Sequence, residues 1–118
     1  MNVSTKMIGN IAVTHLVGEI DTVDSDDFAG ALSTLVAANP ASIVLDFSEV
    51  TFIASIGLSL LVKLTQQMRM SRGKVMIASV SPAVLKVLET VHMQSIIPIK
   101  PSVDAALTSL GVRTATAA

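Results

Sequence analysis

The clearest hydrophobic pattern in the chain is the short run Ser42-Ile43-Val44-Leu45-Asp46-Phe47. A nearly unbroken run of apolar and β-branched residues is typical of a strand covered on both faces, so we expect it in the middle of a sheet. Beyond Gly57 the apolar positions take helical spacing, until Arg72-Gly73 supplies a stop signal. Residues 50–58 therefore join a central strand to an apolar helix, and Ser55 stands where that helix begins.

The pattern before this run predicts a hairpin and a helix. Residues 3–8 and 11–17 flank Gly9-Asn10, a pair typical of a two-residue turn between antiparallel strands. A helix follows, ended by Asn39-Pro40, and its apolar face consists of Phe28, Leu32, Leu35 and Val36.

The pattern after residue 73 predicts two more strands and two more helices. Residues 74–78 form a short buried strand, and Ser81-Pro82 is a typical helix start. A strand at residues 96–99 contains Pro98, which cannot donate to a ladder, so this strand belongs at a sheet edge. Ser102 caps the final helix.

The order of these elements predicts the fold class. We expect an α/β fold with a mostly parallel sheet of about five strands, an antiparallel edge pair and about four helices. Residues 1–118 form a single domain, with a core at about 3–112 and a loose tail at 113–118.

Composition narrows the function classes. The net charge is −1, 14% of residues are charged and tyrosine and tryptophan are absent, which disfavours nucleic-acid binding. Cysteine is absent, and no secretion signal is visible, so we expect a cytoplasmic protein. The longest apolar stretch, residues 50–62, is shorter than the roughly 20 residues of a membrane span, so no membrane insertion is expected. So apolar a chain predicts some hydrophobic surface, suited to a protein partner or a homodimer.

Ser55 admits several interpretations from local pattern alone. A serine at the start of a helix is most often an N-cap, although a hydroxyl there also suits phosphate. A nucleophile elbow requires glycine two residues before the serine, where this chain has Ile53. An enzyme combining Ser55 with His15 or His92 and Asp46 is therefore disfavoured.

Other polar residues have structural explanations. His15 lies on an alternating strand without a second histidine at ligand spacing, so no metal site is expected. The glycines are isolated, so no phosphate loop or cofactor site is expected. Glu19 and Asp21 are predicted to lie in a loop at a strand's end, where they are either solvated acids or part of a site.

Three segments together resemble one family. They are Leu16-x-Gly18-Glu19-Ile20-Asp21, Ile43-Val44-Leu45-Asp46-Phe47 and Phe52-Ile53-Ala54-Ser55-Ile56-Gly57-Leu58. Their order and spacing resemble the STAS domain family, and more closely the bacterial anti-sigma factor antagonists. The resemblance spans about residues 3–112. Where the family often has Asp-Ser-Ser-Gly, this chain has Ala54-Ser55-Ile56-Gly57.

The resemblance implies a function. In the family, the unphosphorylated protein binds an anti-sigma factor that is also a serine kinase and so releases the sigma factor. Phosphorylation of the serine that matches Ser55 blocks binding, and a serine phosphatase restores it. The partner surface implied here consists of Glu19, Asp21, Thr22, Ala54, Ser55, Ile56, Gly57 and Leu58. The alternative within the family is an unphosphorylated STAS module in a transporter or signalling assembly.

Overall fold

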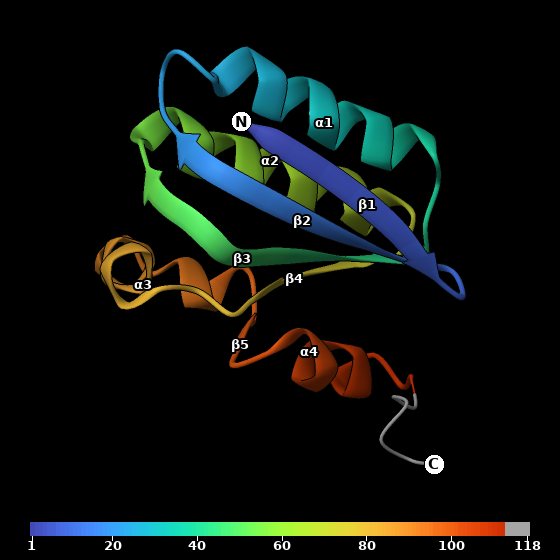
Figure 1. The fold of residues 1–118 in the computed structure, drawn as a ribbon. Helices are drawn as coiled ribbons and strands as arrows, with labels where there is room; N and C mark the ends of the chain where they lie inside the picture. The colour runs from blue at the N-terminus through green and yellow to red at the C-terminus, as the bar shows by residue number, and fades with distance from the viewer. Residues whose placement is uncertain (113–118) are drawn as a thin grey trace.

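One mixed sheet forms the centre of the computed structural model, which describes residues 1–112 (Figure 1). Its strands follow the order β1-β2-β3-β4-β5, with β1 antiparallel to β2 and all other neighbours parallel. Their bounds are Asn2–Ile8, Ile11–Ile20, Ser42–Ile53, Lys74–Ala78 and Ile99–Lys100. The predicted α/β class, with its antiparallel edge pair, is confirmed. The predicted tail, residues 113–118, lies outside the described residues.

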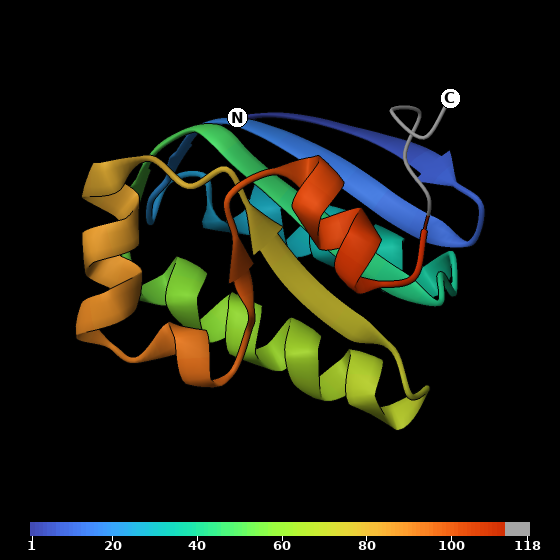
Figure 2. The same cartoon turned by 90° about the horizontal axis from the view of Figure 1, so that it is seen from below.

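Helices cover the two faces of the sheet unequally (Figures 1 and 2). Helices α1 (Ser25–Ala37) and α2 (Ser55–Met70) lie side by side on one face, and α4 (Val103–Ser109) lies on the other. Helix α3 (Pro82–Thr90) and a short 3-10 turn (Met93–Ser95) lie between β4 and β5 in the chain. Among the described residues, no helix is long and apolar enough to span a bilayer.

Two hydrophobic clusters hold these layers together. The larger one joins α1 and α2 to the sheet and includes the fully buried side chains of Phe28 and Phe47. The smaller one joins α4 to the opposite face through residues such as Val44 and Leu107. Because Val44 lies in the smaller cluster and its neighbours Ile43 and Leu45 in the larger, β3 is apolar on both faces, as its continuous hydrophobic run predicts.

Strand β3 is longer than the pattern predicted. It continues beyond Phe47 to Ile53, paired with β2 as far as Ile20. Two register shifts relative to β2 place extra residues in β3, and such bulges interrupt the alternation by which a strand is recognised. One consequence concerns Glu19, which lies within β2 and not in the predicted loop.

The last strand also differs from its prediction. Residues 96–97 follow the 3-10 turn, where the Ile97 amide donates to the Met93 carbonyl, and β5 comprises only Ile99–Lys100. The strand does lie at the sheet edge, as Pro98 predicted. Ser102 caps α4 as expected, because its hydroxyl accepts a hydrogen bond from the Ala105 amide at 3.0 Å.

Candidate functional site

Ser55 lies at the junction between β3 and α2. Strand β3 ends at Ile53, Ala54 is extended (φ −91°, ψ 169°), and Ser55 is the first residue of the helix. The Ala54 amide donates to the Ile20 carbonyl at 2.8 Å, which ties the junction to the end of β2. Asp21 follows Ile20 and Ser55 follows Ala54, so the Asp21 loop and the start of α2 begin at neighbouring points of the backbone.

The N-cap interpretation of Ser55 is wrong. The cap position belongs to Ala54, which has no side-chain oxygen, and Ser55 is one residue further into the helix. Ser55 is exposed, and its hydroxyl forms no hydrogen bond with any residue of the described part of the chain. No acid lies in the first turn of α2. The hydroxyl is therefore free, beside backbone amides that favour negative charge.

Gly57 fixes how closely the first turn of α2 approaches the sheet. A Cβ atom at this position would lie 2.6 Å from Ile20 Cγ2 and 2.9 Å from Ile53 Cγ1. Both isoleucines are buried in the core, so they have little room to move. The close approach of α2 to the sheet is therefore what requires glycine here. Because Gly57 is buried, it shapes the surface without being part of it.

Two exposed apolar residues close to Ser55 in the chain, Ile56 and Phe52, form an apolar rim at the junction between β3 and α2. Ile56 is 40% exposed and Phe52 is 47% exposed. Phe52 pairs with Glu19 across the β2–β3 ladder, which places an aromatic ring beside one of the predicted partner-binding acids. The prediction from sequence omitted Phe52. The sequence feature that could have identified Phe52 is its position next to the apolar Ile53. Consecutive strand residues point to opposite faces, so one of these two side chains is left uncovered.

The loop after β2 supplies the acidic side of this surface. The Asp21 carboxylate accepts the Asp24 amide at 2.9 Å, and the Ser25 hydroxyl donates to the Thr22 carbonyl at 2.9 Å. These bonds hold the loop in one shape at the start of α1. Asp21 is half-buried, whereas Glu19 and Thr22 are exposed. Of the remaining predicted residues, Ala54 and Leu58 are half-buried, and Leu58 packs against the core.

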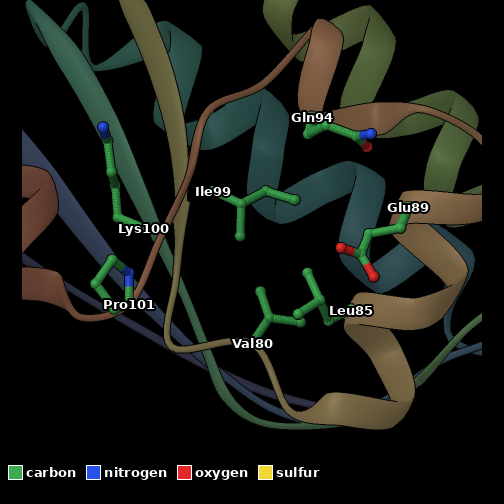
Figure 3. A pocket seen from close by; sticks show the side chains of 7 residues that line it. All are labelled: Val80, Leu85, Glu89, Gln94, Ile99, Lys100 and Pro101. Atoms are coloured by element: carbon green, nitrogen blue, oxygen red, sulfur yellow. The ribbon is translucent and has the colours of Figure 1, made fainter.

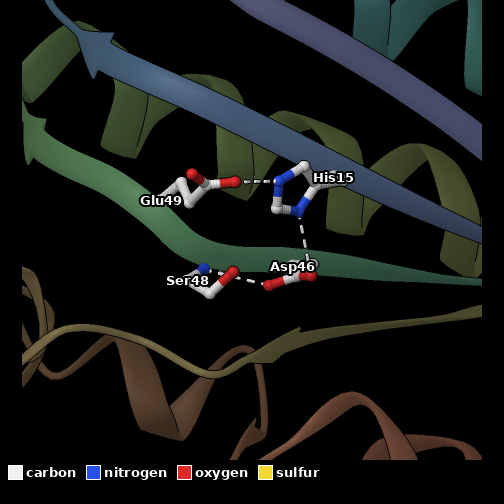
Figure 4. A network of polar contacts seen from close by, with 4 residues as sticks. All are labelled: His15, Asp46, Ser48 and Glu49. Carbon is white, nitrogen blue, oxygen red and sulfur yellow. Dashed lines mark hydrogen bonds and ion pairs between the residues drawn. The ribbon is translucent and has the colours of Figure 1, made fainter.

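His15 belongs to a separate polar cluster (Figure 4). Its Nδ1 lies 3.0 Å from an Asp46 carboxylate oxygen and its Nε2 lies 2.5 Å from a Glu49 oxygen, so the imidazole bridges two acids of β3. A second Asp46 oxygen accepts the Ser48 amide at 2.9 Å. In the described part of the chain, no group of His, Cys, Asp and Glu is arranged to hold a metal ion.

This cluster is too far from Ser55 to act with it. Asp46 pairs with His15, and Ile53 lies seven positions further along the same strand. At roughly 3.3 Å per residue, the two ends lie about 23 Å apart. The structure therefore does not bring together Ser55, His15 and Asp46, the residues of the disfavoured catalytic arrangement.

The cluster predicts a pH-dependent stability. Hydrogen bonds to Asp46 and Glu49 raise the pKa of His15 above 6.5. Burial would raise the pKa of Asp46, but hydrogen bonds from Ser48 and His15 lower it below its usual value. A histidine whose pKa is higher in the folded state stabilises the fold at pH values below its unfolded-state pKa of about 6.5. This stabilisation is lost as the pH rises through the folded-state pKa.

We therefore expect the free energy of unfolding to be larger at about pH 5.5 than at about pH 8.5. Since His15 is partly exposed, the difference stays below about 1 kcal/mol. Urea unfolding at the two pH values measures it. His15→Gln should remove the difference, and His92→Asn, which removes the other imidazole, should retain it. An unchanged pH dependence in His15→Gln would contradict this assignment.

A cleft of about 350 Å³ lies elsewhere, between α3, the 3-10 turn and β5 (Figure 3). Val80, Leu85 and Ile99 form its apolar lining, and Glu89 and Lys100 place opposite charges at its rim. None of its lining residues belongs to the predicted partner surface.

The Ser55 surface consists of an exposed rim and a free hydroxyl, a geometry suited to contact with a protein.

Comparison with known proteins identifies the family. The model of the STAS domain matches residues 2–106. The chain belongs to the STAS domain family. This STAS chain is 24% identical over 106 residues to BtrV of Bordetella bronchiseptica, named as a candidate anti-sigma factor antagonist, covering 90% of this chain and 91% of BtrV. It is 34% identical over 61 residues to the anti-sigma-F factor antagonist RsfB of Mycobacterium tuberculosis, covering 52% of this chain and 50% of RsfB.

Solved structures share the fold. The crystal structure of an anti-sigma factor antagonist from Mycobacterium paratuberculosis superposes with a TM-score of 0.83, at 25% identity and 94% coverage of each chain. A sulfate transporter family protein from Wolinella succinogenes superposes with a TM-score of 0.75, at 15% identity, covering 90% of this chain and 89% of the other. The STAS fold itself is therefore common to proteins of different kinds.

Proposed function

We propose that this STAS chain is an anti-sigma factor antagonist regulated by phosphorylation of Ser55. The unphosphorylated chain binds an anti-sigma factor that is also a serine kinase, and this binding releases the sigma factor. A serine phosphatase restores the binding-competent form. The observation that carries the proposal is the exposed, unbonded Ser55 hydroxyl at the start of α2, in a chain whose relatives are named anti-sigma factor antagonists.

The surface around Ser55 supports docking of a protein. Exposed Phe52 and Ile56 supply apolar area, and exposed Glu19 and Thr22 supply a polar margin. Large apolar side chains surrounded by polar groups are typical of interface centres. Buried Gly57 and core-packed Leu58 contribute by holding the first turn of α2 in place. The output of this surface is binding, and no catalytic step by the chain is required.

The same surface explains why phosphorylation would switch binding off. A phosphate adds about −1.5 to −2 charge at pH 7. In the complex this charge would be desolvated against the apolar rim and would lie near the carboxylate of Asp21. Both effects oppose association, and a combined cost of about 4 kcal/mol corresponds to a thousandfold loss of affinity. No refolding is needed.

Phosphate transfer tests the proposed site. We expect incubation with ATP and the anti-sigma kinases encoded in the same genome to add one phosphate to the wild-type chain, as measured by intact mass. Ser55→Ala removes the only proposed acceptor, so its mass should stay unchanged. Ser59→Ala removes another exposed serine of α2 and serves as the matched control. Phosphate that persists in Ser55→Ala would refute the site.

A second function within the family rests on Ala54. The position before Ser55, where the family often has an acid, carries no polar side chain here. A chain that is not a kinase substrate would act as an unphosphorylated STAS module in a transporter or signalling assembly. Affinity capture distinguishes the two functions, because it would recover transporter subunits in one case and an anti-sigma factor in the other.

A further inference from the structure

The two edges of the sheet are protected very differently. Strand β5 has only two residues and is bracketed by Pro98 and Pro101, which cannot donate to a neighbouring strand. Strand β1 has seven residues, contains no proline and pairs with β2 without any register shift (Figures 1 and 2). A long, regular and exposed edge strand is a template for pairing with another strand. Among the described residues, no strand pairs with the outer edge of β1.

The hairpin register shows which β1 groups face outward. Ile8 and Ile11 flank the two-residue turn, so this closing pair exchanges both of its hydrogen bonds. Hydrogen-bonded pairs alternate along an antiparallel ladder, so the backbone groups of Ser4 and Lys6 also face β2. The amides and carbonyls of Val3, Thr5 and Met7 then point away from the sheet, free for a further strand.

We propose that β1 pairs antiparallel with β1 of a second copy of this chain, about a two-fold axis at Thr5. In this register Thr5 faces its own equivalent, and Val3 of each copy faces Met7 of the other. Each of these three residues donates one backbone hydrogen bond across the axis and accepts one. Two five-stranded sheets become one continuous sheet.

The side chains of β1 complement themselves in this register. Val3 and Met7 are 38% and 51% exposed, although both are apolar, and the axis at Thr5 brings each against the other. Lys6 faces Ser4 of the other copy, so no like charges meet. Apolar cross-strand pairs stabilise a sheet and directly facing like charges destabilise it. A two-fold dimer requires this self-complementarity.

Neighbouring registers lack these advantages. An axis at Lys6 would place the two Lys6 ammonium groups directly opposite each other. An axis at Ser4 would pair Val3 with Thr5 and leave Met7 without a partner strand. The axis at Thr5 therefore combines the most outward-facing backbone groups with paired apolar side chains and separated charges. The surface that it uses shares no residue with the Ser55 surface, so the dimer and the proposed function stand or fall separately.

Hydrogen exchange of the full chain tests the pairing without any substitution. At low concentration, the amides of Val3, Thr5 and Met7 should exchange quickly, while those of Ser4 and Lys6 are protected by β2. At high concentration, where sedimentation velocity should report a dimer, protection should extend to Val3, Thr5 and Met7. A chain that stays monomeric at all concentrations overturns the proposal and leaves this edge to a strand of another protein. A dimer that leaves these three amides unprotected also overturns it.

A pair of matched double variants tests the register. Val3→Glu combined with Met7→Glu makes like charges face each other and should weaken dimerisation by more than about tenfold. Val3→Glu combined with Met7→Lys makes opposite charges face each other and should restore most of the affinity, with a marked dependence on salt. Both substituted positions of β1 are exposed, so thermal unfolding should show that both variants remain folded. Equal dimer affinities for the two variants would overturn the proposed register.

Discussion

Ser55→Glu is expected to lower the affinity for the anti-sigma factor by about a hundredfold, or about 2.7 kcal/mol. It places one negative charge, against nearly two for phosphate, on the apolar rim beside Asp21. The substitution should not harm the fold. Ser55 is the first residue of α2, a helix whose first turn contains no acid, so a carboxylate there adds about 0.3–1 kcal/mol of stability. Titration calorimetry measures the affinity and urea unfolding measures the stability.

Affinity lost while stability is kept or gained is the signature of a surface switch. Ser33→Glu adds the same charge in the middle of α1, at an exposed position outside the proposed surface, and should leave the affinity unchanged. Ser55→Ala keeps the surface neutral and should bind like the wild type. Unchanged binding by Ser55→Glu would mean that the partner does not cover this residue.

Gly57→Val is expected to lower the free energy of unfolding by about 3 kcal/mol. The new Cβ would lie 2.6 Å from Ile20 and 2.9 Å from Ile53, and overpacking a closed core typically costs about 1–3 kcal/mol before the additional methyl groups of valine are accommodated. Valine has a higher helix propensity than glycine, but this difference offsets the loss by only a fraction of 1 kcal/mol. Because a typical domain is stable by about 5–15 kcal/mol, the effect is large. The urea midpoint measures it.

Gly30→Ala supplies the matched control for this position. Gly30 lies inside α1, and a Cβ there meets nothing within 4 Å, so alanine should stabilise the chain by about 0.5–1 kcal/mol. If Gly57→Val lowers the free energy of unfolding and Gly30→Ala raises it, the loss at Gly57 comes from close approach to the sheet and not from helix propensity. A Gly57→Val variant as stable as the wild type would show that α2 can move away from the sheet at little cost.

Much of the fold could be predicted because its signals are local. The apolar run at residues 42–47 marked the central strand, and the alternating order of strands and helices indicated a parallel sheet. Ser102 marked the start of α4 through its own side chain. Signals failed where tertiary structure decides the outcome. The bulges in β3 opposite β2 extend this strand to Ile53, and the intrinsic propensities of its residues do not predict these bulges.

The candidate site was predicted through its resemblance more than through its chemistry. Local pattern made Ser55 an N-cap, whereas the structure places Ala54 at the cap and shows no hydrogen bond from the Ser55 hydroxyl to any described residue. The need for glycine at position 57 depends on side chains from two other segments, so it could not be derived from neighbours in sequence. The same holds for His15, whose acidic partners come from β3, more than 30 residues later in the chain.

The most direct test of the Ser55 switch is the affinity of the chain for its anti-sigma kinase before and after complete phosphorylation at Ser55. Titration calorimetry on the two purified forms, at the same salt concentration, gives both dissociation constants. We predict tight binding by the unphosphorylated form and binding weaker by about a thousandfold for the phosphorylated form. Equal dissociation constants for the two forms would contradict the account.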